Sequence, residues 1–174
     1  STTNVFSSKA NYGFIGPNDI STGSGLPATT NGLYVYKSNA AKKITLTNTV
    51  RADSILKMNS GHILAVSPIY IELGVDASNK GTLSYTSGYV LGKMRRWYSS
   101  TNSGIASGLF PLGQDVSGVF KNRHYYIQYT NAATTGGYLD VNFNPVAMGL
   151  SGIPILGIPA VGSCASSFDV TSTE

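Results

Sequence analysis

The sequence predicts an all-β protein, and three observations support this. Only 11% of the 174 residues are charged, while 20 are glycine and 11 are tyrosine, a balance typical of short strands joined by tight turns. Apolar and polar residues alternate in short runs. No stretch combines helical periodicity with caps over three turns. We expect a β-sandwich of many short antiparallel strands, with a few β-solenoid-like rungs as the alternative arrangement in the first half.

The length predicts a single module over residues 1–174 that is large enough to bury a core. Residues 1–32 are polar and weakly patterned, and residues 33–150 form the expected β core. Residues 151–174 make a Pro/Gly-rich apolar C-terminal segment. Within it, the prolines of Ile153–Pro159 exclude a central strand or a helix, so that run is expected to be an extended edge or cover strand.

Strands are expected wherever alternation is clear and turn residues bound the run. In the first half these runs are Leu33–Tyr36, Lys43–Val50, Ser54–Met58, His62–Val66 and Ile69–Leu73. In the second half they are Gly81–Tyr85, Tyr89–Tyr98, Arg123–Thr130 and Tyr138–Phe143. The last two are expected to form a hairpin across Gly136 and Gly137. One core should contain Phe110, Leu139, Val141 and Phe143 together with Tyr125, Ile127 or Tyr129.

The charge pattern argues against a nucleic-acid partner. Twelve basic and eight acidic side chains give a net charge of +4, and the only basic clusters are Lys42–Lys43 and Lys93–Arg96. Strand alternation places Lys93, Arg95 and Trp97 on one face and Met94, Arg96 and Tyr98 on the other. No apolar run reaches the length of a membrane-spanning helix. The single cysteine, Cys164, excludes an internal disulfide and a cysteine-based metal cluster.

No catalytic residue, metal or cofactor is expected from the pattern. The eight acidic residues are scattered, although Asp115 and Asp140 are a pair that the fold could bring together. His62 and His124 are expected to be hydrogen-bonded structural residues. Calcium ligands are conceivable at Gly16–Asp19 and Val75–Asn79, but each offers one carboxylate, which favours an Asx-type turn.

Exposed aromatics are the alternative functional group, because flat apolar faces with polar rims suit sugar rings. The candidates for glycan stacking are Trp97, Tyr98 and Tyr126. A platform of this kind has to present at least two rings coplanar to solvent. If the rings lie under strands or loops instead, a structural role is favoured.

One segment resembles a known kind of module. In Gly88–Gly149 a basic-aromatic strand and a Ser/Asn/Gly loop precede a Phe-Pro-Leu-Gly turn (Phe110–Gly113), a tyrosine strand and a Gly-Gly turn. This order resembles β-rich modules of Bacteroidetes proteins exported by the type IX secretion system, including adhesins, over Lys43–Leu150. Family members often carry Tyr-Arg-Pro after the turn, where this chain has Asn122-Arg123-His124.

The resemblance implies export and display at the cell surface, and it supplies no catalytic residue. We expect a non-enzymatic structural or adhesive module of a surface protein or fibre. Its partners would be neighbouring modules, copies of itself or surface glycans, and the assembly contact would involve Ile153, Ile155 and Ile158. Asp53-Ser54-Ile55 resembles an O-glycosylation acceptor motif of such proteins, with Ser54 as the acceptor and an ordinary turn as the alternative.

Overall fold

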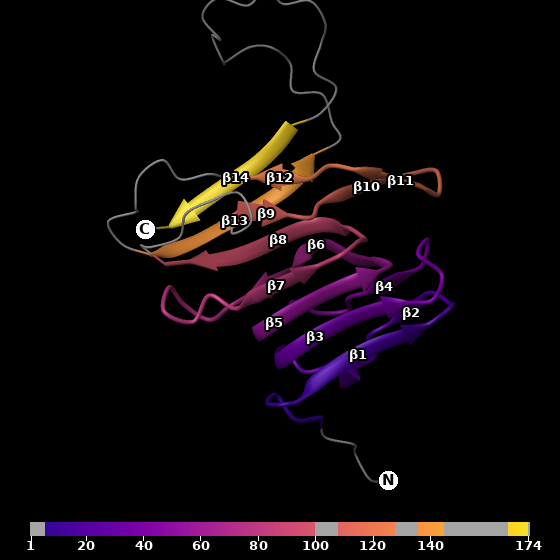
Figure 1. Cartoon of the computed structure of the whole chain (residues 1–174), viewed down its shortest axis with the longest axis horizontal. Helices are drawn as coiled ribbons and strands as arrows, with labels where there is room; N and C mark the ends of the chain where they lie inside the picture. The colour runs from indigo at the N-terminus through magenta and orange to yellow at the C-terminus, as the bar shows by residue number, and fades with distance from the viewer. Residues whose placement is uncertain (1–5, 100–107, 128–135, 145–166, 174) are drawn as a thin grey trace, which may run out of the picture.

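Figure 1 shows the computed structural model, which describes residues 6–99, 108–127, 136–144 and 167–173. These residues form strands and one 3-10 turn, η1 (Gly23–Gly25), so the all-β prediction is confirmed. The first strands are β1 (Asn11–Gly16), β2 (Ile20–Ser21), β3 (Thr29–Lys37), β4 (Lys43–Thr45), β5 (Val50–Ser60), β6 (His62–Leu73) and β7 (Thr82–Tyr85). The later strands are β8 (Val90–Tyr98), β9 (Leu109–Phe110), β10 (Gly113–Val116), β11 (Val119–Asn122), β12 (Tyr125–Tyr126), β13 (Gly137–Asn144) and β14 (Ser167–Thr173).

The strands form a β-solenoid-like stack in which successive rungs pair in parallel. The first ladder joins β1, β3, the second half of β5 and β7. The second ladder joins β2, β4, the first half of β6 and the start of β8. The third ladder joins the starts of β3 and β5 to the second halves of β6 and β8. The stack runs from β1 at one end to β13 and β14 at the other (Figure 1).

Stacked aliphatic rows fill the interior because in-register parallel pairing places like positions above one another. One row in the second ladder is Ile20, Ile44, Ile63 and Val90. A row in the third ladder is Val50, Ile71, Met94 and Val141. Every member of both rows except Ile20 is fully buried. Each such side chain contributes about 1.5–3 kcal/mol on burial, so these rows make a large contribution to stability.

The expected sandwich of antiparallel strands is not confirmed, because most pairs in the main sheet are parallel. Antiparallel pairing in that sheet occurs where β13 joins β8 and where β14 joins β13. Two short antiparallel pairs, β10 with β11 and β9 with β12, lie beside the stack (Figure 1). The solenoid-like rungs, expected as an alternative for the first half, extend through β8.

Several strands also have other boundaries or partners than the sequence predicts. The break at Ser67–Pro68 falls inside β6, where pairing with β8 jumps from Ala65 to Tyr70 as an irregularity. The expected hairpin of Arg123–Thr130 with Tyr138–Phe143 is wrong over the described residues, because β13 pairs with β8 and β14 while β12 pairs with β9. The expected strand over Lys43–Val50 is divided, since β4 ends at Thr45 and β5 begins at Val50.

The expected second-half core is confirmed. Phe110, Val141 and Phe143 are buried in one cluster, and Leu139, Tyr125 and Ile127 pack against it. Tyr129, Cys164 and the C-terminal residues Ile153, Ile155 and Ile158 lie outside the described residues. The strand β14 was not expected from the sequence.

Candidate functional site

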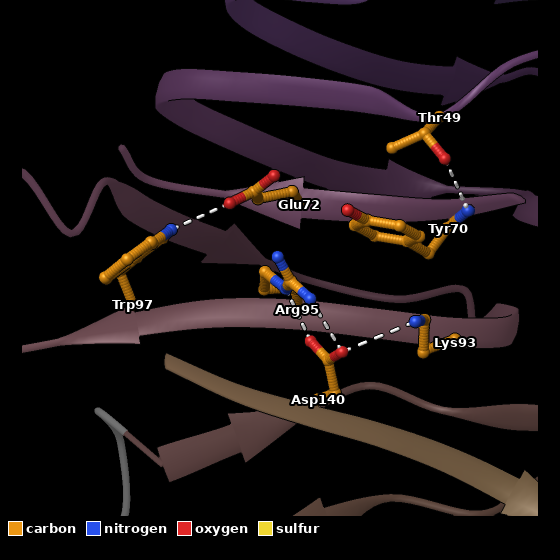
Figure 2. Close-up of polar contacts among 7 residues, drawn as sticks. All are labelled: Thr49, Tyr70, Glu72, Lys93, Arg95, Trp97 and Asp140. Atoms are coloured by element: carbon orange, nitrogen blue, oxygen red, sulfur yellow. Dashed lines mark hydrogen bonds and ion pairs between the residues drawn. The ribbon is translucent and has the colours of Figure 1, made fainter. Parts of the chain in front are cut away.

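The candidate site lies on the outward side of the third ladder, where charged and aromatic side chains alternate across three strands. Alternation in β8 turns Lys93, Arg95 and Trp97 away from the buried Met94 and Tyr98, as predicted. We call the whole set the charged-aromatic surface: Tyr70 and Glu72 from β6, Lys93, Arg95 and Trp97 from β8, and Tyr138 and Asp140 from β13. Figure 2 shows the members of this surface other than Tyr138, together with the polar contacts among them.

An ion pair holds the centre of this surface. Arg95 lies directly between Glu72 and Asp140 in the strand register. Its Nε and Nη2 donate to the Asp140 carboxylate at 2.6 and 2.9 Å, and Lys93 Nζ approaches the same carboxylate at 3.3 Å (Figure 2). The hydrogen bond to Asp140 raises the pKa of Arg95. Burial by itself would raise the pKa of Asp140, but the bonds and charges of Arg95 and Lys93 outweigh it and lower that pKa.

Aromatic rings enclose the cations on both sides. The Arg95 guanidinium carbon lies 3.8 Å from the Tyr138 ring centroid and 5.0 Å from that of Tyr70. Lys93 Nζ lies 4.3 Å from the Tyr70 centroid. Trp97 Nε1 donates to Glu72 Oε1 at 2.8 Å, and its ring meets Tyr138 edge-on, with centroids 5.1 Å apart and planes at 69°. Asp140 is therefore the shared partner of both cations, while Glu72 is satisfied by the indole of Trp97.

This arrangement acts as a clamp between β6, β8 and β13, at the point where pairing changes from parallel to antiparallel. The side chains of Arg95 and Asp140 are 19% and 12% exposed, so their bidentate bond is shielded from water. A hollow of about 230 Å³ lies next to Lys93 and is lined by Ser67, Pro68 and Asn142, among others. The contacts of the clamp join the three strands to one another.

Replacing Arg95 by Leu is expected to lower the free energy of unfolding by about 1–3 kcal/mol, because the largely buried Asp140 loses its principal partner. Asp53→Ala is the matched control. It breaks the more exposed Arg51–Asp53 pair, whose side chains are 33% and 29% exposed, and should cost less than about 1 kcal/mol. Urea denaturation of both variants measures the difference. Equal losses would contradict the clamp.

The three aromatics expected to bind glycans do not form a common platform. Tyr98 is 3% exposed and lies in the core beside Phe110. Tyr126 is 53% exposed, but it belongs to β12 and contacts His124 instead. Trp97 is half-buried and meets its aromatic neighbour Tyr138 edge-on. The criterion of two coplanar rings is therefore not met by Trp97, Tyr98 and Tyr126.

Both histidines occupy hydrogen-bonded positions. His62 Nδ1 accepts the backbone N–H of Tyr89 at 3.1 Å, and its ring packs on those of Tyr89 and Phe120. Burial lowers the pKa of His62 to about 4. His124 Nε2 bonds with Tyr85 Oη at 3.0 Å, and burial lowers its pKa as well. Each imidazole is fixed by its aromatic neighbours.

The carboxylates of interest lie apart. Asp115 pairs with Lys43 at 3.5 Å, whereas Asp140 belongs to the charged-aromatic surface. Asp76 Oδ1 accepts the backbone N–H groups of Ser78 and Asn79 at 2.8 Å each, which confirms the expected Asx-type turn. Within the described ranges no group of three or more His, Cys, Asp or Glu side chains is placed to hold a metal ion.

Ser54 lies exposed on β5, where its Oγ donates to Asn31 Oδ1 at 2.8 Å. The preceding Asp53 is paired with Arg51 at 2.7 Å. Glycosylation of Ser54 stays a prediction, because an accessible hydroxyl is a requirement for the modification and not a sign of it.

A second aromatic pair escaped the sequence-based list of candidates. Tyr34 and Tyr36 lie two apart on β3 with planes at 10° and centroids 6.4 Å apart. The alternation of buried Leu33 and Val35 with the two tyrosines was the available signal, because it places both rings on one side of the strand.

Comparison with known proteins gives no relative from which a role could be transferred. No family model matches the chain, and no curated protein or solved structure is significantly similar to it. In the part of the chain that the structure describes, no helix has the length and apolar character needed to cross a membrane.

Proposed function

We propose that this chain is a non-enzymatic structural module of an exported cell-surface protein or fibre, and that it acts by joining neighbouring modules or subunits. The observation that carries the proposal is the unfinished end of the solenoid-like stack at β1 and β2. Among the described strands, β3, β4, β5, β6 and β8 each pair on both sides, whereas β1 pairs with β3 alone and β2 with β4 alone.

The exposed fractions along the aliphatic row of the second ladder show that the described part of the stack ends at β2. Ile44, Ile63 and Val90 are 0% exposed, but Ile20, the terminal member of the same row, is 44% exposed. The difference arises because no described strand pairs with β2 on the side away from β4. One further rung would bury it as completely as the others.

Other apolar groups gather at the same end. Phe6 and Ile15 are 50% and 72% exposed. A hollow of about 230 Å³ is lined by Phe6, Tyr12, Phe14 and Leu26, among others. An open strand edge with apolar groups beside it is a template for strand addition, because an incoming strand satisfies the free backbone groups and covers the apolar atoms. The occupant that fits is a parallel rung from a neighbouring module.

Self-association of the isolated chain tests the proposal, because a second copy can supply the covering surface. We expect light scattering to show a concentration-dependent increase in mass for the parent chain. Ile20→Lys should shift this association at least about tenfold toward monomer, because it places a charge where the apolar row continues.

Val119→Lys is the matched control, since Val119 is 54% exposed on β11, away from this end. It should associate like the parent. A parent that stays monomeric at every concentration, or an Ile20→Lys variant that associates as strongly as Val119→Lys, contradicts the proposal. Thermal melts of both variants establish that each is folded.

A further inference from the structure

We propose that the outward side of β3 binds an anionic polysaccharide, with sugar rings stacked on Tyr34 and Tyr36 and an acidic group paired with Lys57. This inference is independent of the module-joining role above, because it concerns the side of the first ladder and not its end.

The two tyrosine rings share one orientation, which stacking on consecutive sugar rings requires. They are half-buried, and their rings are within 10° of parallel, with centroids 6.4 Å apart. That separation matches the two-residue repeat of a strand, so both rings lean the same way along β3. In the other pairs of exposed or half-exposed aromatic rings among the described residues, the ring planes meet at 60° or more. Trp97 and Tyr138, for example, meet at 69°.

Gly32 allows the Tyr34 ring to lie flat against the strand, because it has no side chain of its own. A Cβ on Gly32 would stand 3.0 Å from Tyr34 Cε2, which shows that the ring extends over Gly32. On the neighbouring strand Gly13 pairs with Tyr34, and a Cβ there would meet no atom within 4 Å. The Tyr34 ring therefore lies over the buried Gly32 and has open space beside it at Gly13. A flat apolar face bounded by open space can be reached by a pyranose ring.

The charge beside the rings selects an anionic ligand. Lys57 pairs with Tyr34 in the register of β3 and β5, and its Nζ lies 5.6 Å from the Tyr36 centroid. The other residues that pair with Gly32, Tyr34 and Tyr36 carry no charge; they are Asn11, Gly13, Ile15, Ile55 and Ser60. The ion pairs of the described residues use other cations, namely Lys42, Lys43, Arg51, Lys93 and Arg95.

The Lys57 ammonium is charged throughout the neutral range, as any lysine with an ordinary or raised pKa is, and hydrogen bonding to Tyr36 raises its pKa further. A side of the sheet with one cation, two parallel rings and no carboxylate among these neighbours complements a uronic-acid polymer. A neutral glucan would gain the stacking alone.

Binding of two fluorescent probes tests the inference: a labelled polygalacturonate oligosaccharide and a labelled cello-oligosaccharide of equal length, both followed by anisotropy. We expect tighter binding of polygalacturonate at about 0.01 M ionic strength and a loss of that preference at about 1 M, where charges are screened. Tyr34→Ala and Tyr36→Ala should each weaken binding of both probes about tenfold.

Lys57→Gln should weaken polygalacturonate binding about threefold and leave the cello-oligosaccharide unchanged. Tyr34→Phe keeps the ring and should retain most of the affinity. Tyr126→Ala, which removes an exposed ring from β12, should bind both probes like the parent.

Four results would overturn the inference. They are failure of the parent to bind either probe, unchanged binding by both Tyr→Ala variants, equal loss in Tyr126→Ala, and a parent dimer that Tyr36→Ala dissociates. The last would make this surface an interface between copies. Failure of the end-to-end joining of modules would leave all of these readouts unaffected.

Discussion

Phe110→Ala is expected to lower the free energy of unfolding by about 3–5 kcal/mol, the usual cost of removing a fully buried phenylalanine. Phe110 is 0% exposed, and its ring contacts those of Tyr98 and Tyr125 with centroids 6.3 Å away in each case. The Arg96 guanidinium carbon also lies 5.8 Å from its centroid. Truncation would thus leave a cavity and remove an aromatic neighbour from a buried cation.

Chemical denaturation monitored by tryptophan fluorescence measures the loss, because Trp97 lies on the adjacent strand β8. Val116→Ala is the control, since Val116 is 42% exposed on β10 and should change stability by less than about 0.5 kcal/mol. Similar denaturation midpoints for Phe110→Ala and the parent would show that the β9 region does not belong to the cooperative core.

Gly88→Ala is expected to cost about 2–5 kcal/mol, because backbone strain and a steric clash coincide at one position. Gly88 has a φ of +98°, and a Cβ there would overlap the carbonyl oxygen of Gly61 on the rung below. The obstacle is backbone, so no side-chain rotation can relieve it. The two rungs would have to move apart.

Gly118→Ala separates the two causes. Gly118 has a φ of +85°, but a Cβ there would meet no atom within 4 Å, so only the conformational strain of about 1 kcal/mol is expected. Gly13→Ala, at a position with neither problem, should be close to neutral. Thermal melts rank the three variants, and a Gly88→Ala variant no less stable than Gly118→Ala would mean that the rungs are not stacked this closely.

Alternation was enough to find most strands but not to pair them. A run such as Leu33–Tyr36 alternates in the same way whether its neighbour is parallel or antiparallel, because alternation depends on the strand alone. The stacking of Ile44 on Ile63 depends on the register between two separate rungs. The residues of either strand alone do not indicate that register. Alternation therefore left the solenoid-like stack as an alternative to the sandwich, while the burial of Phe110, Val141 and Phe143 was predicted directly.

The candidate site could also be predicted only in part from the sequence. Placing Lys93, Arg95 and Trp97 on one side of their strand needed only local alternation. Their pairing with Glu72 and Asp140 needed the register of three strands, two of them distant in the chain. The burial of Tyr98 could not be predicted for the same reason, because burial depends on what covers each side of the strand.

The direction of the hydrogen bonds in the stack has a mechanical consequence. Bonds between neighbouring strands lie across the strands, and therefore along the line from β1 to β14. A tensile load applied along that line passes through every strand interface in series, so the weakest interface sets the force that the module withstands. The β8–β13 interface is where strand direction reverses, and there the Arg95–Asp140 bond adds a charged crosslink parallel to the load.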